Sequence, residues 1–414
     1  MTKITDQLCQ SYLDLKWHLD PAAGSFAGAT EYDDRLGQFD EESIGEYLVA
    51  LRSIGAAVEE SGVAPEEFGE VIMGCVLPAG LGQAPARQAA IGAGIPESVG
   101  ATTINKMCGS GMKATMLAHD LIRAGASQVM LAGGMESMSN APYLLPKARG
   151  GMRLGHGQVM DHMFLDGLED AYDKGRLMGS FAEDCAARYG FTREAQDAFA
   201  VESLTRAKKA IDSGAFDREV VPVVVKTRRG EQQVAHDEQP HKANLEKIPQ
   251  LKPAFRNDGT VTAANSSSIS DGAAALVLMP ASEAERRSTR PLARVTGHAS
   301  YAHQPGWFTT APVFAIRKLL EQLDWPIDTV DLFEINEAFA VVTMAAMIEL
   351  ELPHDKVNVH GGACALGHPV GASGARIIVT LLAALEHYDL RRGVAALCIG
   401  GGEATAIGIE RLPA

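Results

Sequence analysis

Two cysteines and one histidine stand in glycine-rich stretches where they could do chemistry. Cys108 lies in Met107-Cys108-Gly109-Ser110-Gly111, directly before a segment whose apolar residues have helical spacing. A thiol at a helix N-terminus lies near free backbone N–H groups and the positive end of the helix dipole, and both favour the thiolate. We therefore expect the pKa of Cys108 to fall below the ordinary value of about 8.5, which would make it a nucleophile. The segment alone fits a buried structural cysteine equally well.

The other candidate groups follow apolar segments or glycine-rich turns. His368 lies between Gly367 and Pro369 among small residues, which favours an imidazole directed into a site. Cys398 ends an apolar run before a glycine triplet that begins at Gly400, and Asn336 follows another apolar run. Because sites in parallel sheets lie at the carboxyl ends of strands, we expect these groups to converge with Cys108.

The elements that must position these residues alternate between helix and strand. The periodicity predicts helices over 41–62 and 109–125, and strands over 70–78 and 127–134. Such alternation predicts an α/β fold with a largely parallel sheet covered by helices. The segment "GSGMKATMLAHDLIRAGASQVMLAGGMES" resembles "GASGARIIVTLLAALEHYDLRRGVAALCIGGGEA", so the second half is interpreted as a repeat of the first. In both, a glycine run ends near an acid, Glu136 or Glu403.

Composition narrows the function classes. The 414 residues carry a formal net charge of −15, which argues against nucleic-acid binding and against docking on anionic lipid. No apolar run is long enough to cross a bilayer, and the start has no signal-peptide layout, so we expect a cytoplasmic protein. Six cysteines without a CxxC spacing indicate reduced thiols, and no metal site is expected.

Several motifs, taken together and in order, resemble those of the thiolase family. They are "GQAPARQAA", "NKMCGSGMKA", "AGGMESMSNAPYLL", "VTAANSSSISDGAAALVL", "NEAFA", "GHPVGASGAR" and "CIGGGEA". The resemblance runs from about Glu70 to the C-terminus and is closest to acetyl-CoA acetyltransferases of the biosynthetic type. It implies two duplicated βαβαβ halves that form a five-layered αβαβα core with an inserted loop domain. The expected divisions are an N-terminal half over 1–139 completed by 265–289, an inserted CoA-binding region over 140–264, and a C-terminal half over 290–414.

The resemblance also implies roles for individual residues. Cys108 would accept the acyl group, and His368 would activate it and bind the thioester oxygen. Cys398 would remove a proton from the α-carbon of the second acetyl-CoA. Asn336, through a water, would complete an oxyanion hole with His368, and the N–H groups of Cys108 and Gly400 would form a second hole.

The implied activity is acetyl-CoA C-acetyltransferase, a ping-pong Claisen condensation of two acetyl-CoA to acetoacetyl-CoA and its reverse thiolysis. Alternatives are a 3-ketoacyl-CoA or 3-oxoadipyl-CoA thiolase of degradation, and an inactive acyl-CoA or lipid-binding protein. Coenzyme A would be a substrate and product, with no permanently bound cofactor. Ser267 would contact the pantetheine, and Leu177 stands where many family members have a histidine. The family resemblance also implies a homo-oligomer, a tetramer or a dimer.

The N-terminus departs from the family pattern. Members of the family open with an apolar strand and an Arg-Thr-Pro segment, whereas this chain has "LDLKWHLDPAA" before Gly24. Three interpretations stay open: another strand takes the place, the segment forms a helix outside the core, or the altered start weakens folding. A sharp, single melting transition of soluble protein would exclude the third.

Overall fold

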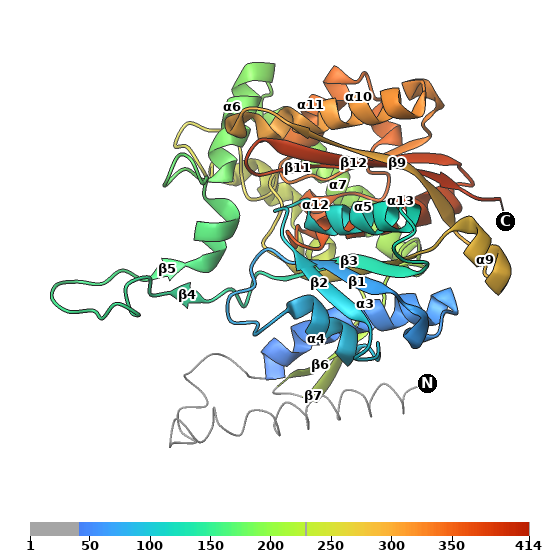
Figure 1. Cartoon of the computed structure of the whole chain (residues 1–414). Helices are drawn as coiled ribbons and strands as arrows, with labels where there is room; N and C mark the ends of the chain where they lie inside the picture. Colours follow the sequence, from blue (N-terminus) through green and yellow to red (C-terminus); the bar gives the residue numbers. More distant parts are fainter. Residues whose placement is uncertain (1–40, 228–229, 414) are drawn as a thin grey trace.

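The computed structural model describes residues 41–227 and 230–413, and these form two sheets with helices between and around them (Figure 1). In Figure 1, α5 and α13 lie between the sheets, α3 and α4 lie below the first sheet, and α10 and α11 lie above the second. The bounds of these helices are α3 Glu41–Ser61, α4 Pro85–Gly92, α5 Ser110–Arg123, α10 Ala311–Leu323, α11 Ala340–Glu349 and α13 Ser373–His387. This layer order agrees with the predicted αβαβα core, and the helices and strands expected in the first half are present.

The strand order is β2-β1-β3-β8 in the first sheet and β10-β11-β12-β9 in the second, and the run β1-β3-β8 matches the run β10-β11-β12. In each sheet a parallel pair (β1 with β3, β10 with β11) is followed by an antiparallel strand. The strands are β1 Glu70–Gly74, β2 Gly100–Ile104, β3 Met130–Ser137, β8 Asp271–Leu278, β9 Ala293–Ala302, β10 Leu332–Ile335, β11 Arg392–Ile399 and β12 Glu403–Arg411.

Within residues 41–227 and 230–413, the first sheet shows no counterpart of strand β9. Strand β12 pairs with β9 on its far side, whereas β8, which takes the same place in the first sheet, pairs only with β3 within the described residues. Most residues of β12 are buried, whereas most residues of β8 are partly exposed. The departure predicted at the start of the chain falls in residues 1–40, outside the described residues.

Two glycines explain how the halves meet. A Cβ on Gly111 would lie 2.7 Å from the backbone nitrogen of Ala375, and one on Gly374 would lie 2.4 Å from that of Met112. These glycines occupy matching positions in the two repeated motifs. They let α5 and α13 approach at backbone distance, and Met112, Met116, Ile377 and Leu381 pack together in the buried cluster around them.

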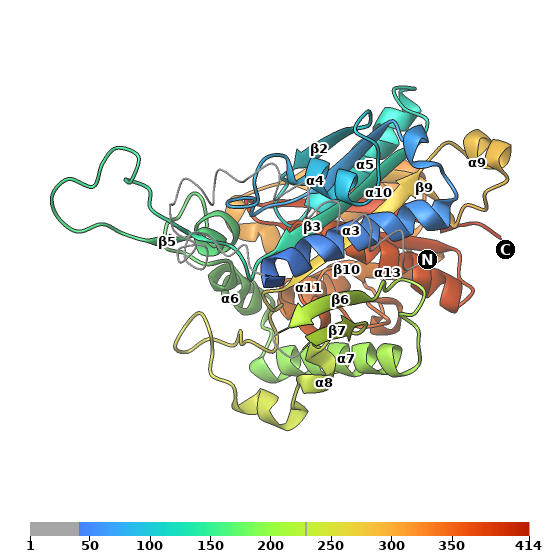
Figure 2. The ribbon, with the colours of Figure 1, turned by 90° about the horizontal axis from the view of Figure 1, so that it is seen from below.

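The region between the two halves contains its own helices and hairpins. It contains α6 Met178–Tyr189, α7 Arg193–Asp212, α8 Gln239–Lys242 and two hairpins, β4 Tyr143–Leu144 with β5 Met160–Asp161 and β6 Val223–Thr227 with β7 Gly230–Val234. Figures 1 and 2 both show the chain between β4 and β5 extending away from the body. The remaining short helices are α9 Ala281–Arg287 and α12 Ala363–Leu366. None of the helices in the described ranges is long and apolar enough to cross a membrane.

Candidate active site

Cys108 is presented by a tight turn between β2 and α5. Met107 has a φ of 49°, a left-handed conformation that side chains rarely adopt. The hydroxyl of Ser110 holds the turn, because it accepts from the backbone N–H of Lys106 (2.8 Å) and donates to the carbonyl of Met107 (2.7 Å). A Cβ on Gly109 would lie 2.4 Å from Cδ1 of Ile399, so a larger residue here would displace the side chain of Ile399.

Two backbone N–H groups point at the sulfur of Cys108, its own and that of Gly400. Both stabilise a thiolate, yet burial outweighs them and raises the pKa of Cys108 to about 11. The expectation of a lowered pKa was therefore wrong: dipoles at the helix start are visible in the sequence, whereas the desolvation of the thiol is not. Cys108 rests as a thiol and needs a base to become a nucleophile.

His368 has the protonation pattern of such a base. Its Nδ1 lies 2.6 Å from the hydroxyl oxygen of Ser373, and that hydroxyl donates its own hydrogen to the carbonyl of Pro369 (3.0 Å). Ser373 must therefore accept from Nδ1–H, which leaves Nε2 with a lone pair. Nε2 is buried and has no hydrogen-bond partner within the described residues. Burial, and secondarily the charge of Arg376, lowers the pKa of His368 to about 3, so the ring is neutral.

Asn336 and Cys398 lie at the carboxyl ends of neighbouring parallel strands, β10 and β11. The side-chain nitrogen of Asn336, just after β10, lies 3.4 Å from Nδ1 of His368, and its Oδ1 has no partner among the described residues. Cys398 is fully buried, and burial together with the neighbouring Cys108 raises its pKa far above the ordinary value. The two sulfur atoms are thus within electrostatic reach of each other, as the convergence of these segments requires.

Each of the two residues expected to contact coenzyme A lies on a segment that contacts a loop of the site. The hydroxyl of Ser267 donates to the carbonyl of Ala338 in the segment after Asn336 (3.0 Å). Leu177 is the residue before α6, and the sulfur of the next residue, Met178, lies 3.5 Å from where a Cβ on Gly400 would stand. Their contact with coenzyme A stays a prediction.

Two acids that sequence reasoning did not place in the site hold its loops. Glu136, at the end of β3, accepts from the backbone N–H of Val76 (2.9 Å), Leu77 (3.0 Å) and Gly371 (2.8 Å). It thereby ties the first half to the turn that carries His368. In the second half, Glu403 forms an ion pair with Lys106, two residues before Cys108. An acid of each half thus holds the catalytic loop of the other half. In the sequence, these two acids were marked only by their place after the repeated glycine runs.

Glu337 braces the back of the site. Its carboxylate is buried and accepts from Ser203 (2.7 Å), the side-chain amide of Asn358 (2.8 Å) and the N–H of Cys364 (3.0 Å). Ser203 lies on α7, so the bond joins the inserted region to the segment that follows Asn336. Burial raises the pKa of Glu337 despite these donors.

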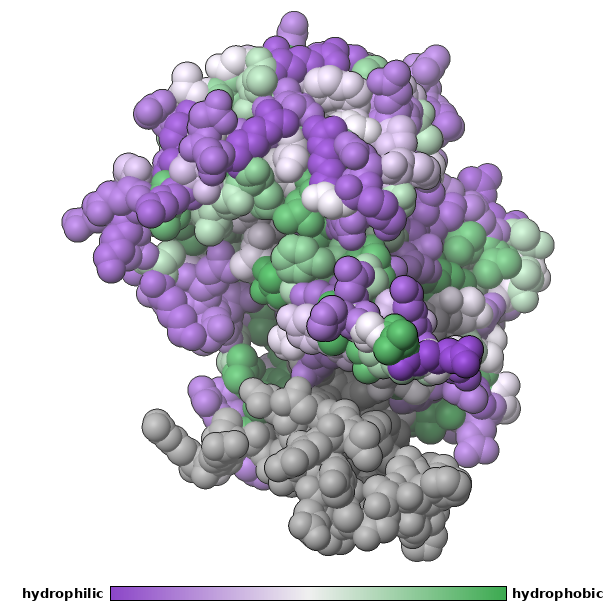
Figure 3. Space-filling view, turned by 90° about the vertical axis from the view of Figure 1, so that its left-hand side faces the viewer, coloured by the Kyte–Doolittle hydropathy of each residue, from purple (hydrophilic) through white to green (hydrophobic). Residues whose placement is uncertain are grey.

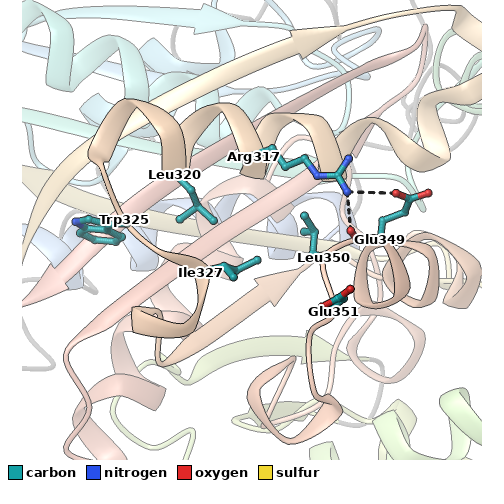
Figure 4. Close-up of a pocket in the computed structure, with 7 residues that line it drawn as sticks. All are labelled: Arg317, Leu320, Trp325, Ile327, Glu349, Leu350 and Glu351. Atoms are coloured by element: carbon teal, nitrogen blue, oxygen red, sulfur yellow. Dashed lines mark hydrogen bonds and ion pairs between the residues drawn. The ribbon is translucent and has the colours of Figure 1, made fainter.

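Bulky apolar side chains pack around Cys398. Cys398 belongs to one buried cluster with Phe181, Phe308 and Phe339, and Met178 packs against it. The rings of Phe181 and Phe308 meet edge to face, with centroids 6.1 Å apart. An open hollow of about 330 Å³ lies elsewhere, between α10 and the end of α11, and none of the groups described above lines it (Figure 4).

Comparison with known proteins agrees with this arrangement. The model of the thiolase N-terminal domain matches residues 29–282, and that of the thiolase C-terminal domain matches residues 289–411. The chain belongs to the thiolase family. The family prediction and the predicted thiolase fold are both confirmed.

Three similar proteins are named acetyl-CoA acetyltransferase, and a fourth is named a thiolase. The chain is 48% identical over 360 residues to the acetyl-CoA acetyltransferase of Cupriavidus necator, covering 86% of this chain and 91% of that one. It is 50% identical over 393 residues to the cytosolic acetyl-CoA acetyltransferase of Mus musculus, covering 94% and 96%. The crystal structure of the Bacillus anthracis acetyl-CoA acetyltransferase superposes with a TM-score of 0.86 at 43% identity, covering 90% and 94%. A thiolase of Ascaris suum in complex with coenzyme A gives 0.84 at 42%, covering 91% and 96%.

Proposed function

We propose that this thiolase is an acetyl-CoA C-acetyltransferase, which condenses two acetyl-CoA to acetoacetyl-CoA and coenzyme A and catalyses the reverse thiolysis. One observation carries the chemistry: the buried, unprotonated Nε2 of His368 stands in a site whose thiol, Cys108, faces two backbone N–H groups. The names of the similar proteins support the substrate. Coenzyme A is then a substrate and product.

The first half-reaction transfers an acetyl group. Nε2 of His368 takes the proton of Cys108, and the thiolate attacks the carbonyl carbon of acetyl-CoA. The N–H groups of Cys108 and Gly400 receive the oxyanion, as two preorganised donors that need no reorganisation during the reaction. The C–S bond to coenzyme A breaks, and the departing thiolate takes a proton from Cys398.

The second half-reaction forms the carbon–carbon bond. The thiolate of Cys398 removes an α-proton from the next acetyl-CoA, and the protonated His368, with a water held by Asn336, stabilises the enolate oxygen. The enolate attacks the acetyl carbon on Cys108, and the sulfur that leaves recovers its proton from His368. Every proton removed is returned, so the enzyme ends the cycle as it began.

Chain length separates this proposal from its alternatives. The Phe181, Phe308 and Phe339 cluster beside Cys398 favours an acetyl group over the longer chains of 3-ketoacyl-CoA or 3-oxoadipyl-CoA. Thiolysis rates for acetoacetyl-CoA, 3-ketooctanoyl-CoA and 3-oxoadipyl-CoA test this directly. We expect acetoacetyl-CoA to have the highest kcat/KM, and a preference for either longer substrate would overturn the assignment.

The nucleophile is tested by replacing Cys108. Cys108→Ala should abolish the release of coenzyme A from acetyl-CoA, whereas Cys185→Ala removes another buried thiol, bonded to the carbonyl of Val341, and should keep it. Full activity of Cys108→Ala would refute the mechanism. If the wild-type protein bound acetyl-CoA but iodoacetamide did not alkylate Cys108, the inactive binding protein would be the better description.

We also propose that the chain forms a homo-oligomer, a dimer or a tetramer, in the cytoplasm. The outer edge of β2 has no partner strand within the described residues. The segment between β4 and β5 exposes large apolar side chains, among them Met152 (54%) and Leu154 (101%), and Figure 3 views the face from which it projects. The free thiols of the described cysteines suit a reducing compartment. Sedimentation of the Met152→Ser and Leu154→Ser variants beside the wild type should show weakened assembly of the variants. A wild-type protein that sediments as a monomer would refute the oligomer.

A further inference from the structure

A cluster of two histidines and one aspartate lies where the two halves meet, apart from the residues assigned to catalysis. His119 and Asp120 are on the last turns of α5, and His298 is on β9. One ligand atom from each residue lies within 4.8 Å of the others. Nε2 of His298 is 2.9 Å from Oδ1 of Asp120, Nδ1 of His119 is 3.6 Å from the same oxygen, and the two imidazole centroids are 5.2 Å apart.

One buried nitrogen atom of this cluster makes no hydrogen bond within the described residues. Nδ1 of His119 is buried and makes no hydrogen bond within the part of the chain that the structure describes. A neutral imidazole nitrogen with a free lone pair is the form that binds a metal ion.

We propose that His119, Asp120 and His298 bind one Zn²⁺ ion, which ties α5 of the first half to β9 of the second. Ligand bonds of 2.0–2.1 Å in a tetrahedral site place the ligand atoms about 3.3 Å apart. The two separations from Oδ1 of Asp120, 2.9 Å and 3.6 Å, bracket this value. Two imidazoles and a carboxylate are a ligand set suited to zinc among the divalent ions.

Exposure leaves room for the fourth ligand. The side chains of His119 and His298 are each 15% exposed, whereas that of Asp120 is 53% exposed, so solvent reaches the cluster from the aspartate side. A water can complete the coordination there. The charge of Arg123 acts on His119 and repels a cation, so we expect moderate affinity. The chain distance between α5 and β9 explains why no spacing in the sequence indicates this site.

Zinc titration of the full-length, chelator-treated protein tests the proposal. Cys108 and Cys398 could bind zinc themselves, so the titration by calorimetry is made in a Cys108→Ala background with the wild type beside it. We expect one ion per chain in that background, a rise in the melting temperature with added zinc, and at least tenfold weaker binding in His119→Ala and in His298→Gln. Co²⁺ bound in place of Zn²⁺ should lack the intense absorption of a thiolate ligand.

The controls separate the site from its neighbours. None of the three residues belongs to the proposed catalytic machinery, so metal-free His298→Gln should keep the thiolysis activity and the melting temperature of the metal-free wild type to within a few degrees. If His119→Ala folds poorly, His119→Gln gives the same comparison. Equal zinc affinity in the wild type and both histidine variants, no zinc binding in the Cys108→Ala background, or a thiolate signature for Co²⁺ would overturn the proposal.

Discussion

Ser373 offers the sharpest test of how His368 is oriented. Its hydroxyl is fully buried and lies 2.6 Å from Nδ1 of His368. Ser373→Ala removes the acceptor, so that the buried Nδ1–H loses its partner at a cost of about 1–3 kcal/mol. The ring can then shift its hydrogen to Nε2 or turn away from Cys108. Because 1.36 kcal/mol corresponds to a factor of ten in rate, we expect kcat to fall by about 5- to 150-fold.

The assay is steady-state thiolysis of acetoacetyl-CoA with the kcat and KM values resolved. Since Ser373 acts through His368, the loss should appear in kcat with little change in KM. Thr115→Ala is the matched control, because it removes another buried hydroxyl, bonded to the carbonyl of Gly111 within α5. A Ser373→Ala enzyme with the kcat of the wild type would refute the assigned tautomer, and equal losses in both variants would indicate a general packing defect.

Three further outcomes follow from the same geometry. Because the pKa of Cys108 is raised to about 11 and that of His368 is lowered to about 3, the fraction of thiolate rises about tenfold per pH unit through neutrality; iodoacetamide alkylation of Cys108 should therefore accelerate steadily from pH 7 to 10, and a plateau at neutral pH would contradict the resting thiol. Glu136→Ala leaves three buried N–H groups without an acceptor and should lower both kcat and the melting temperature, by several kcal/mol in the free energy of unfolding; chemical denaturation measures the loss. Phe308→Ala opens the wall beside Cys398 and should raise the kcat/KM for 3-ketooctanoyl-CoA relative to acetoacetyl-CoA, and an unchanged ratio would show that this ring does not limit chain length.

The reacting groups could be found from the sequence because each stands in a short, unusual local context. Cys108 precedes a helix among glycines, His368 sits in a turn of small residues, and Cys398 ends a strand before a glycine triplet. Such contexts depend on a few adjacent residues, which a single sequence displays. The alternation of helix and strand was visible for the same reason and predicted an α/β fold, whereas the five-layered core was implied by the family resemblance.

What failed or was missed depends on residues far apart in the chain. The raised pKa of Cys108 comes from burial under other segments, and the bracing of His368 by Glu136 joins Gly371 to a residue 235 positions away. In the sequence Gly111 and Gly374 stand out only as small residues, whereas in the structure each one admits the helix of the other half. A local pattern shows that a residue is small, but it does not show which segment of the fold packs against that residue.

The central claim is that Cys108 carries the acetyl group between the two half-reactions. The most direct measurement is peptide mass spectrometry after a brief exposure to acetyl-CoA and an acid quench. We expect one acetyl group on the peptide that contains Cys108, removed when free coenzyme A is added. An acetyl group on Cys398, or release of coenzyme A with no acetyl group on the protein, would contradict the account.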